Sequence, residues 1–104
     1  MGKKHDIDEL TTLLSKSLRH SIGAFVNREE FYADRYAKDS EVLLREAEKV
    51  VARRSWNKED VIEIYELLRK KLRKELEEKT FIGTEKFDIM DAEIETVLKR
   101  LDLK

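Results

Sequence analysis

The 104 residues of the chain are enough for one domain with a single modest core. Charged residues make up 43% of the sequence, well above the roughly 25% of an average domain, and this excess favours long solvated helices over a sheet protein. The formal net charge of -1 gives no support to a polyanionic partner, and the lack of cysteine excludes disulfides, thiolate nucleophiles and cysteine metal sites.

No apolar run approaches the roughly 18 residues of a membrane-spanning helix, and the first residues lack the apolar core of a signal peptide. We therefore expect a soluble cytoplasmic protein without a membrane partner. The chain has no proline and is rich in Glu and Lys, a bias reported for proteins of hyperthermophiles.

The first helix is expected over residues 6–26, after a short flexible tail of residues 1–5. Asp6 stands at the N-cap position, and Glu9 is spaced to complete a capping box with it. At about 100° per residue, the apolar side chains fall in one arc roughly 120° wide, which predicts a single buried face. These side chains are Ile7, Leu10, Leu14, Leu18, Ile22 and Phe25.

The second helix is expected over residues 27–54. Asn27 is the predicted N-cap, Glu30 completes its capping box, and Val26 and Phe31 are spaced for a hydrophobic staple. The apolar residues spread over about 140° and several are small, so this helix should touch two neighbours closely. They are Tyr32, Ala33, Tyr36, Ala37, Leu43, Leu44, Ala47, Val50 and Val51.

The third helix is expected over residues 57–80 and repeats the same starting chemistry. Asn57 and Asp60 form the predicted capping box, and Trp56 is placed to pack on Val61 as a staple. One apolar stripe then follows the helical period, which indicates one buried face. Its members are Val61, Ile64, Tyr65, Leu68, Leu72 and Leu76.

The fourth helix is expected over residues 84–103, with Thr84 or Asp88 as its N-cap. Gly83 precedes it and is suited to a left-handed helix stop. Its apolar residues alternate in steps of three and four, as in a coiled-coil seam. They are Phe87, Met90, Ile94, Val97 and Leu101. Together the four amphipathic helices and their short connections predict an all-α fold, a compact bundle that forms a single domain of residues 1–104.

A run of cations in the third helix raises the question of nucleic-acid binding, because five of the six residues from Arg69 to Lys74 are basic. On a helix these cations spread around the whole polar side, and acids lie four residues from several of them. The expected pairs are Glu66 with Lys70, Arg73 with Glu77, and Lys74 with Glu78. Lys and Arg also equal Asp and Glu in number within residues 28–54 and again within residues 55–79, so we interpret the run as a solvated, ion-paired face.

The segment VARRSWNK is the strongest candidate for a nucleic-acid contact. Arg53 and Arg54 adjoin Trp56 and Lys58 at a turn where a base could stack. A structural role explains the same residues, because cations complement the end of a helix and Trp56 can staple the next one. The full alternative site comprises Arg53, Arg54, Trp56, Lys58, Arg69, Lys70, Arg73 and Lys74.

The remaining polar residues suggest no catalytic or metal site. His20 lies off the apolar stripe with no evident Ser or carboxylate partner, so we expect a histidine at the rim of the bundle. The spacing of Glu and His needed for a di-metal bundle is absent. Tyr32 and Tyr36 lie one turn apart and most simply fill the core, with a small-molecule pocket as the alternative. We expect no cofactor, no metal and no enzymatic activity.

Four apolar residues off the main stripes could form a patch for a partner. We therefore interpret the protein as a non-enzymatic helical interaction module, an adaptor or small subunit that binds another protein or a second copy of itself. The alternative is an accessory nucleic-acid-binding protein that uses the basic residues above. The candidate protein interface consists of Leu13, Ile62, Leu67 and Ile89.

Overall fold

Four helices and no strand make up the part of the chain that the computed structural model describes, which is residues 2–26, 33–78 and 85–103. Helix α1 spans Lys3–Val26, α2 spans Ala33–Val51, α3 spans Lys58–Glu78 and α4 spans Glu85–Arg100. The all-α bundle of four amphipathic helices is therefore confirmed.

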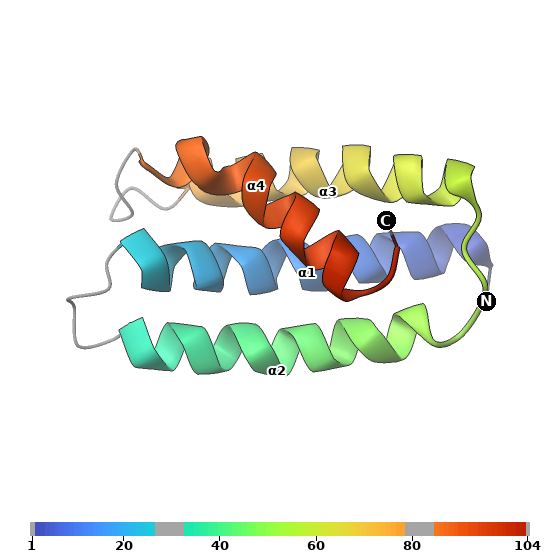
Figure 1. The fold of residues 1–104 in the computed structure, drawn as a ribbon, viewed down its shortest axis with the longest axis horizontal. Helices are drawn as coiled ribbons and strands as arrows, with labels where there is room; N and C mark the ends of the chain where they lie inside the picture. Colours follow the sequence, from blue (N-terminus) through green and yellow to red (C-terminus); the bar gives the residue numbers. More distant parts are fainter. Residues whose placement is uncertain (1, 27–32, 79–84, 104) are drawn as a thin grey trace.

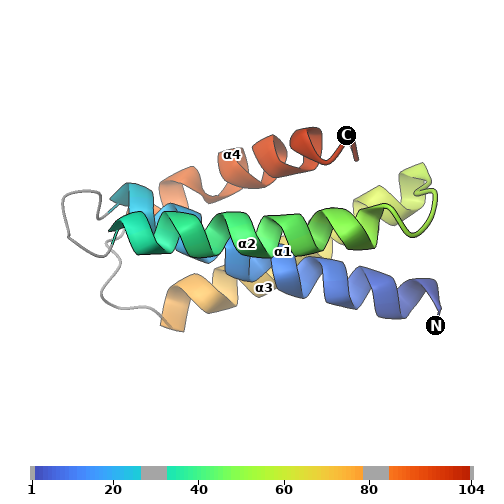
Figure 2. The same cartoon turned by 90° about the horizontal axis from the view of Figure 1, so that it is seen from below.

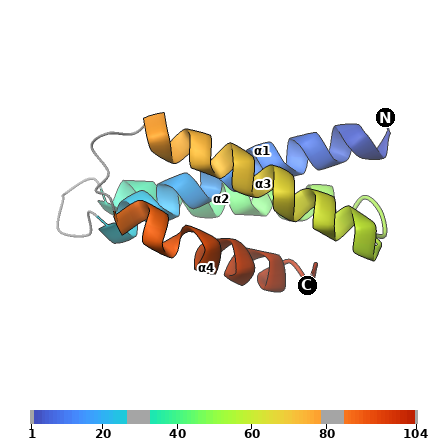
Figure 3. The ribbon, with the colours of Figure 1, turned by 90° about the horizontal axis from the view of Figure 1, so that it is seen from above.

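Helix α1 is the central helix, because it packs against each of the other three. It lies between α2 and α3, and α4 crosses in front of it (Figure 1). Figure 2 shows α4 on one side of the other three helices, and Figure 3 shows α3 running beside α1 in the same chain direction. Helix α3 also contacts α4. Among the described residues the backbone of α2 approaches α1 alone. Its second neighbour is α4, which it meets through side chains, so the predicted close approach of α2 to two helices is found for α1 only.

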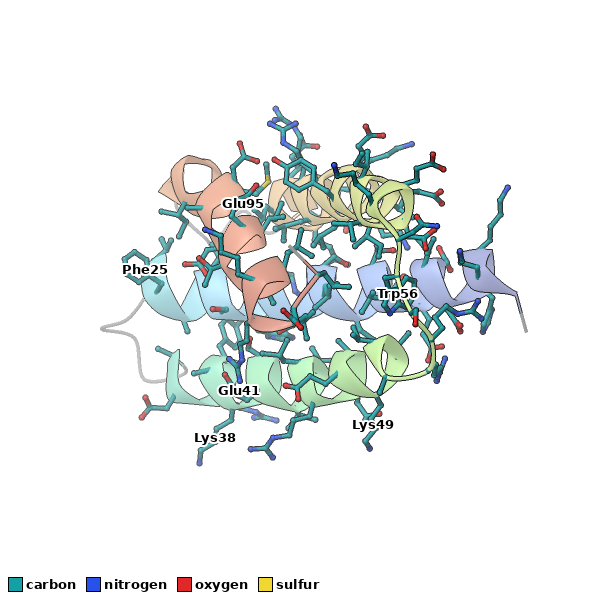
Figure 4. All side chains as sticks on the ribbon, turned by 45° about the vertical axis from the view of Figure 1, so that its right-hand side comes forward. Phe25, Lys38, Glu41, Lys49, Trp56 and Glu95 are labelled. Atoms are coloured by element: carbon teal, nitrogen blue, oxygen red, sulfur yellow. The ribbon has the colours of Figure 1, made fainter. Side chains whose placement is uncertain are left out.

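The buried core follows the predicted stripes closely. On α1 it extends from Ile7 to Ile22, but Phe25, which was expected to continue it, is 54% exposed. Phe25 lies in the last turn of α1 and points away from the other helices (Figure 4). Two further residues at the end of the chain, Leu98 and Leu103, are buried and had not been predicted. The rest of the core comes from the other helices and from Leu101 just after α4: Ala33, Leu44, Ala47, Val50, Ile64, Leu68, Leu72, Leu76, Met90, Ile94, Val97 and Leu101.

The N-terminal helix begins earlier than the sequence suggested. Residues 3–5, expected to be a flexible tail, form the first turn of α1, and the Asp6 amide donates to the Gly2 carbonyl at 3.2 Å. Because that amide is already paired within the helix, Asp6 is not its N-cap, and its carboxylate bonds elsewhere. The predicted caps at Asn27 and Thr84 lie outside the described residues, whereas Asp88 lies inside α4 and so does not cap it.

The start of α3 confirms the predicted capping box. The Asp60 amide donates to Asn57 Oδ1 at 2.8 Å, and the Asn57 amide donates to Asp60 Oδ2 at 3.0 Å. Each side chain therefore satisfies one of the amides that a helix start leaves without an internal partner.

Helix α4 ends at Arg100 because the chain enters the left-handed region at Asp102, where φ is 61°. The Leu103 amide donates to the Leu98 carbonyl at 2.9 Å, and the Asp102 amide donates to the Lys99 carbonyl at 3.0 Å. This pair of bonds is a Schellman motif, and the burial of both leucines supplies its usual apolar contact.

Candidate functional site

The basic turn after α2 is tied to the start of α1. Arg53 Nη1 donates to Asp6 Oδ1 at 3.1 Å and to Glu9 Oε1 at 2.7 Å. Arg54 Nε donates to Asp6 Oδ2 at 2.8 Å, and Arg54 Nη2 lies 2.7 Å from the same oxygen. Asp6 is only 4% exposed, so two arginines close over a buried carboxylate. Both arginines of the predicted nucleic-acid contact therefore hold α1 to the α2–α3 turn.

The contacts at this turn shift the pKa values of the charged groups that make them. Burial acts to raise the pKa of Asp6, but the hydrogen bonds from Arg54 and Arg53 outweigh it and hold that pKa below its usual range. Hydrogen bonds to Glu9 and Asp6 raise the pKa of Arg53. The hydrogen bond from the Asn57 amide lowers the pKa of Asp60, and Lys3, whose Nζ lies 3.1 Å from Asp60 Oδ2, adds to that effect. The carboxylates of Asp6 and Asp60 are therefore held in their charged form.

Trp56 lies at the same turn in a structural position. Its indole Nε1 donates to the Val51 carbonyl at 2.9 Å, which satisfies a carbonyl at the end of α2. The ring is half-buried and packs against the core, as does Val61, its predicted staple partner. Lys58, the last member of this group, is exposed.

The cations of α3 divide among different neighbours. Arg69 Nε donates to Asp91 Oδ1 on α4 at 2.9 Å, a contact that raises the pKa of Arg69. Lys71 reaches α1, where its Nζ lies 2.8 Å from Asp8 Oδ1 and 2.8 Å from Thr11 Oγ1. The hydrogen bond from Lys71 lowers the pKa of Asp8. Two of the five cations thus join α3 to other helices.

Only one of the three predicted ion pairs along α3 is present. Arg73 Nε donates to Glu77 Oε1 at 3.2 Å. The pairs of Glu66 with Lys70 and of Lys74 with Glu78 are not formed among the described side chains. An open groove between α3 and α4 is lined by Tyr65, Glu66, Arg69, Lys70, Arg73 and Asp91, whereas Lys74 lines another surface with α1. The run is therefore dispersed, as the helical geometry predicted.

The predicted apolar interface is not gathered on the surface. Leu13, Leu67 and Ile89 are half-buried and pack against the core. Ile62 alone is strongly exposed, at 54%. Leu13, Leu67 and Ile89 lie outside the main apolar stripes of their helices, but neighbouring helices cover part of their surface.

His20 links α1 to α2. Its ring meets the ring of Tyr36 edge-on with centroids 5.3 Å apart, and Arg19 Nη2 lies 2.9 Å from His20 Nε2. Arg19 Nη1 in turn lies 3.3 Å from Glu75 on α3. The half-buried histidine is thus a packing residue between helices, while Tyr32, the other member of the predicted tyrosine pocket, lies outside the described residues.

One small cavity of about 80 Å³ lies between α1, α2 and α4. Beside this cavity, the Ser17 hydroxyl on α1 donates to the Ser40 carbonyl on α2 at 2.8 Å. At its edge, Arg100 Nη2 donates to Glu41 Oε2 at 3.1 Å and so joins α4 to α2. The volume suits a few water molecules and is well below the roughly 300 Å³ of a small-molecule site.

Other kinds of site leave no trace in the described part of the chain. Among the side chains that the structure describes, no three acidic or histidine residues cluster closely enough to hold a metal ion. Over residues 2–26, 33–78 and 85–103 no helix has the length and apolarity required to cross a membrane.

One exposed surface was not predicted from the sequence, and we call it the basic face of α2. Arg35, Lys38, Val42, Arg45 and Lys49 are all exposed and recur in steps of three and four, so they form one stripe about 80° wide and about 21 Å long. No acid falls within that stripe. Lys38 and Lys49 extend from α2 away from the other helices (Figure 4). The signal was available in the helical spacing, but summing charge over the whole segment concealed it.

Comparisons with protein-family models, with curated proteins and with solved structures give no match.

Proposed function

We propose that the protein is a non-enzymatic helical interaction module, an adaptor or small subunit that binds another protein or a second copy of itself. The basic face of α2 carries the proposal. Its cations Arg35, Lys38 and Arg45 form no ion pair with any described residue, and Val42 in the middle of the stripe is 56% exposed. Helix α2 packs against α1 and meets α4 through Glu41, but the five residues of this face are all exposed, so the face buries nothing within the described chain.

The use of the other charges supports the same proposal. Arg53, Arg54, Arg69 and Lys71 bridge between helices or turns, where they stabilise the bundle. An apolar residue flanked by unpaired charges is the arrangement of a small recognition surface, in which the centre supplies burial and the rim supplies selectivity.

Affinity capture with matched baits tests the proposal. Wild-type protein and the variant Val42→Glu are compared on nuclease-treated lysate, with Lys99→Glu, an exposed cation of α4, as the control. The wild type and the control should retain a protein that Val42→Glu loses, because the variant places a buried charge at the centre of the contact. Equal capture by all three baits, or no protein with any of them, would contradict the proposal.

A second candidate function is nucleic-acid binding, which is favoured by the groove that brings Tyr65 together with Arg69, Lys70 and Arg73. The acids Glu66 and Asp91 in the same groove oppose it. We expect DNA and RNA oligomers to bind no tighter than about 10⁻⁴ M at physiological salt. Exchanging Lys70 and Lys74 for Gln should change that binding little and cost only tenths of a kcal/mol in stability. Micromolar binding whose salt dependence flattens in this double variant would establish the alternative.

A further inference from the structure

A second exposed surface has the opposite charge, and we call it the acidic face of α3. Its members are Glu59, Ile62, Glu63 and Glu66, all exposed, with Ile62 at 54%. None of the three glutamates forms an ion pair with another described residue. The two large aliphatic side chains that are strongly exposed in the described chain, Val42 and Ile62, therefore lie within faces of opposite charge.

The charged residues around Val42 have the same spacing as those around Ile62. On α2, Lys38 precedes Val42 by four residues and Arg45 follows it by three. On α3, Glu59 precedes Ile62 by three residues and Glu66 follows it by four. Both charged pairs are seven residues apart, about 10.5 Å along a helix. An antiparallel contact with Val42 on Ile62 therefore brings Lys38 opposite Glu66 and Arg45 opposite Glu59.

We propose that the basic face of α2 docks antiparallel on the acidic face of α3 of a second copy of the chain. The proposal rests on the interaction function above and names its partner. Helices α2 and α3 lie on opposite sides of α1 (Figure 1), so one copy cannot satisfy both of its faces with the same neighbour. The contact is head-to-tail, and it extends to chains of copies beyond the dimer.

Charge favours the contact of α2 with α3 over a contact of α2 with α2 or of α3 with α3. Two basic faces of α2 would place like charges together, and two acidic faces of α3 would do the same, which disfavours both arrangements. One turn beyond Glu66, Arg69 is already neutralised by Asp91, so it does not repel the incoming α2 strongly. A single helix face buries less than the roughly 800 Å² per partner of a stable interface, so we expect a dissociation constant on the order of 10⁻⁴ M.

Two charge reversals provide the test. Arg45→Glu makes the basic face acidic at one end, and Glu59→Arg makes the facing end of the acidic face basic. Sedimentation equilibrium over roughly 10⁻⁵ to 10⁻³ M protein measures association of the wild type, of each variant and of their equimolar mixture. Lys99→Glu and Glu78→Arg make the same changes of charge at exposed positions outside both faces. Circular dichroism checks that every variant remains folded.

The wild type should associate beyond the dimer, and its association should weaken as salt is raised. Each single reversal should weaken self-association about tenfold or more, because it replaces attraction by repulsion. The mixture should associate again, since each variant offers the face that complements the other. The two control variants should behave as the wild type does.

Three results would overturn the proposal. They are a wild type that stays monomeric over the whole range, reversals that act no more strongly than the controls, and a mixture that fails to recover. The interaction function would survive these results if Val42→Glu still lost a different protein from nuclease-treated lysate. If a DNA or RNA oligomer bound the basic face of α2 and a second copy did not, the occupant named here would be wrong.

Discussion

The capping box at the start of α3 gives a sharp prediction about the turn on which the bundle depends. Replacing Asn57 by alanine removes the Oδ1 atom that accepts the Asp60 amide at 2.8 Å, at a position where Asp60 is only 7% exposed. Loss of such a cap costs about 0.5–2 kcal/mol in the free energy of unfolding. For a domain of this size, a cost of about 1 kcal/mol lowers the melting temperature by about 4–8 °C.

Thermal unfolding followed by circular dichroism measures this change. Asn57→Ser keeps an oxygen acceptor at the cap, so its melting temperature should stay close to that of the wild type. Lys58→Ala changes the neighbouring exposed residue and serves as the control. An unchanged melting temperature for Asn57→Ala, or an equal loss in the control, would show that the hydrogen bonds at this turn do not stabilise the bundle.

Three further substitutions probe the core, the last helix end and the buried carboxylate. Leu14→Ala should lower the free energy of unfolding by about 2–5 kcal/mol in chemical denaturation, since Leu14 is fully buried on the central helix. Asp102→Gly should raise the free energy of unfolding by about 0.5–1 kcal/mol, because glycine adopts φ near 61° without strain. A variant less stable than the wild type would refute the assigned helix cap. The pKa of Asp6 is lowered in the fold, so its stabilisation is present above about pH 4 and is lost as the pH falls through the lower folded value. Asp6→Asn should therefore destabilise at neutral pH, and a deficit that stayed constant into acid would contradict the role of the arginine contacts.

Features that depend on neighbouring residues could be predicted from the sequence. The apolar stripes of α1, α3 and α4 recur every three or four residues, and most of their described members are buried, while Val61 and Tyr65 are half-buried. The capping box of α3 joins residues only three apart, so its chemistry is visible locally. Phe25 departs from its stripe because periodicity shows which side of a helix a residue occupies, but not where the neighbouring helix ends.

Features that depend on the fold could not be read from one segment. Arg53 and Arg54 looked available for a ligand because their partner Asp6 lies almost half the chain away in sequence. The same holds for Lys71, whose contacts with Asp8 and Thr11 join helices that are distant in sequence. The packing of α1 against the α2–α3 turn and against α3 brings these charges together, and it determines which cations remain available for a partner.

The basic face of α2 is an intermediate case. The steps from Arg35 to Lys49 through Val42 are as regular as those of a core stripe, so a helical wheel of charge alone would have revealed them. What the sequence could not show is that no described helix covers this side of α2, whose five residues are all exposed.

Cross-linking of mixed isotopes tests the contact between copies most directly. Natural-abundance and nitrogen-15 protein are mixed in equal amounts and treated with a short amine-reactive reagent, and links between copies then appear as peptide pairs of mixed isotope. Docking of α2 on α3 predicts mixed links from Lys38 to Lys70 and from Lys49 to Lys58, because the antiparallel arrangement brings these lysines near each other. Mixed links that join Lys38 to Lys49, or an absence of mixed links at protein concentrations where sedimentation shows association, would contradict it.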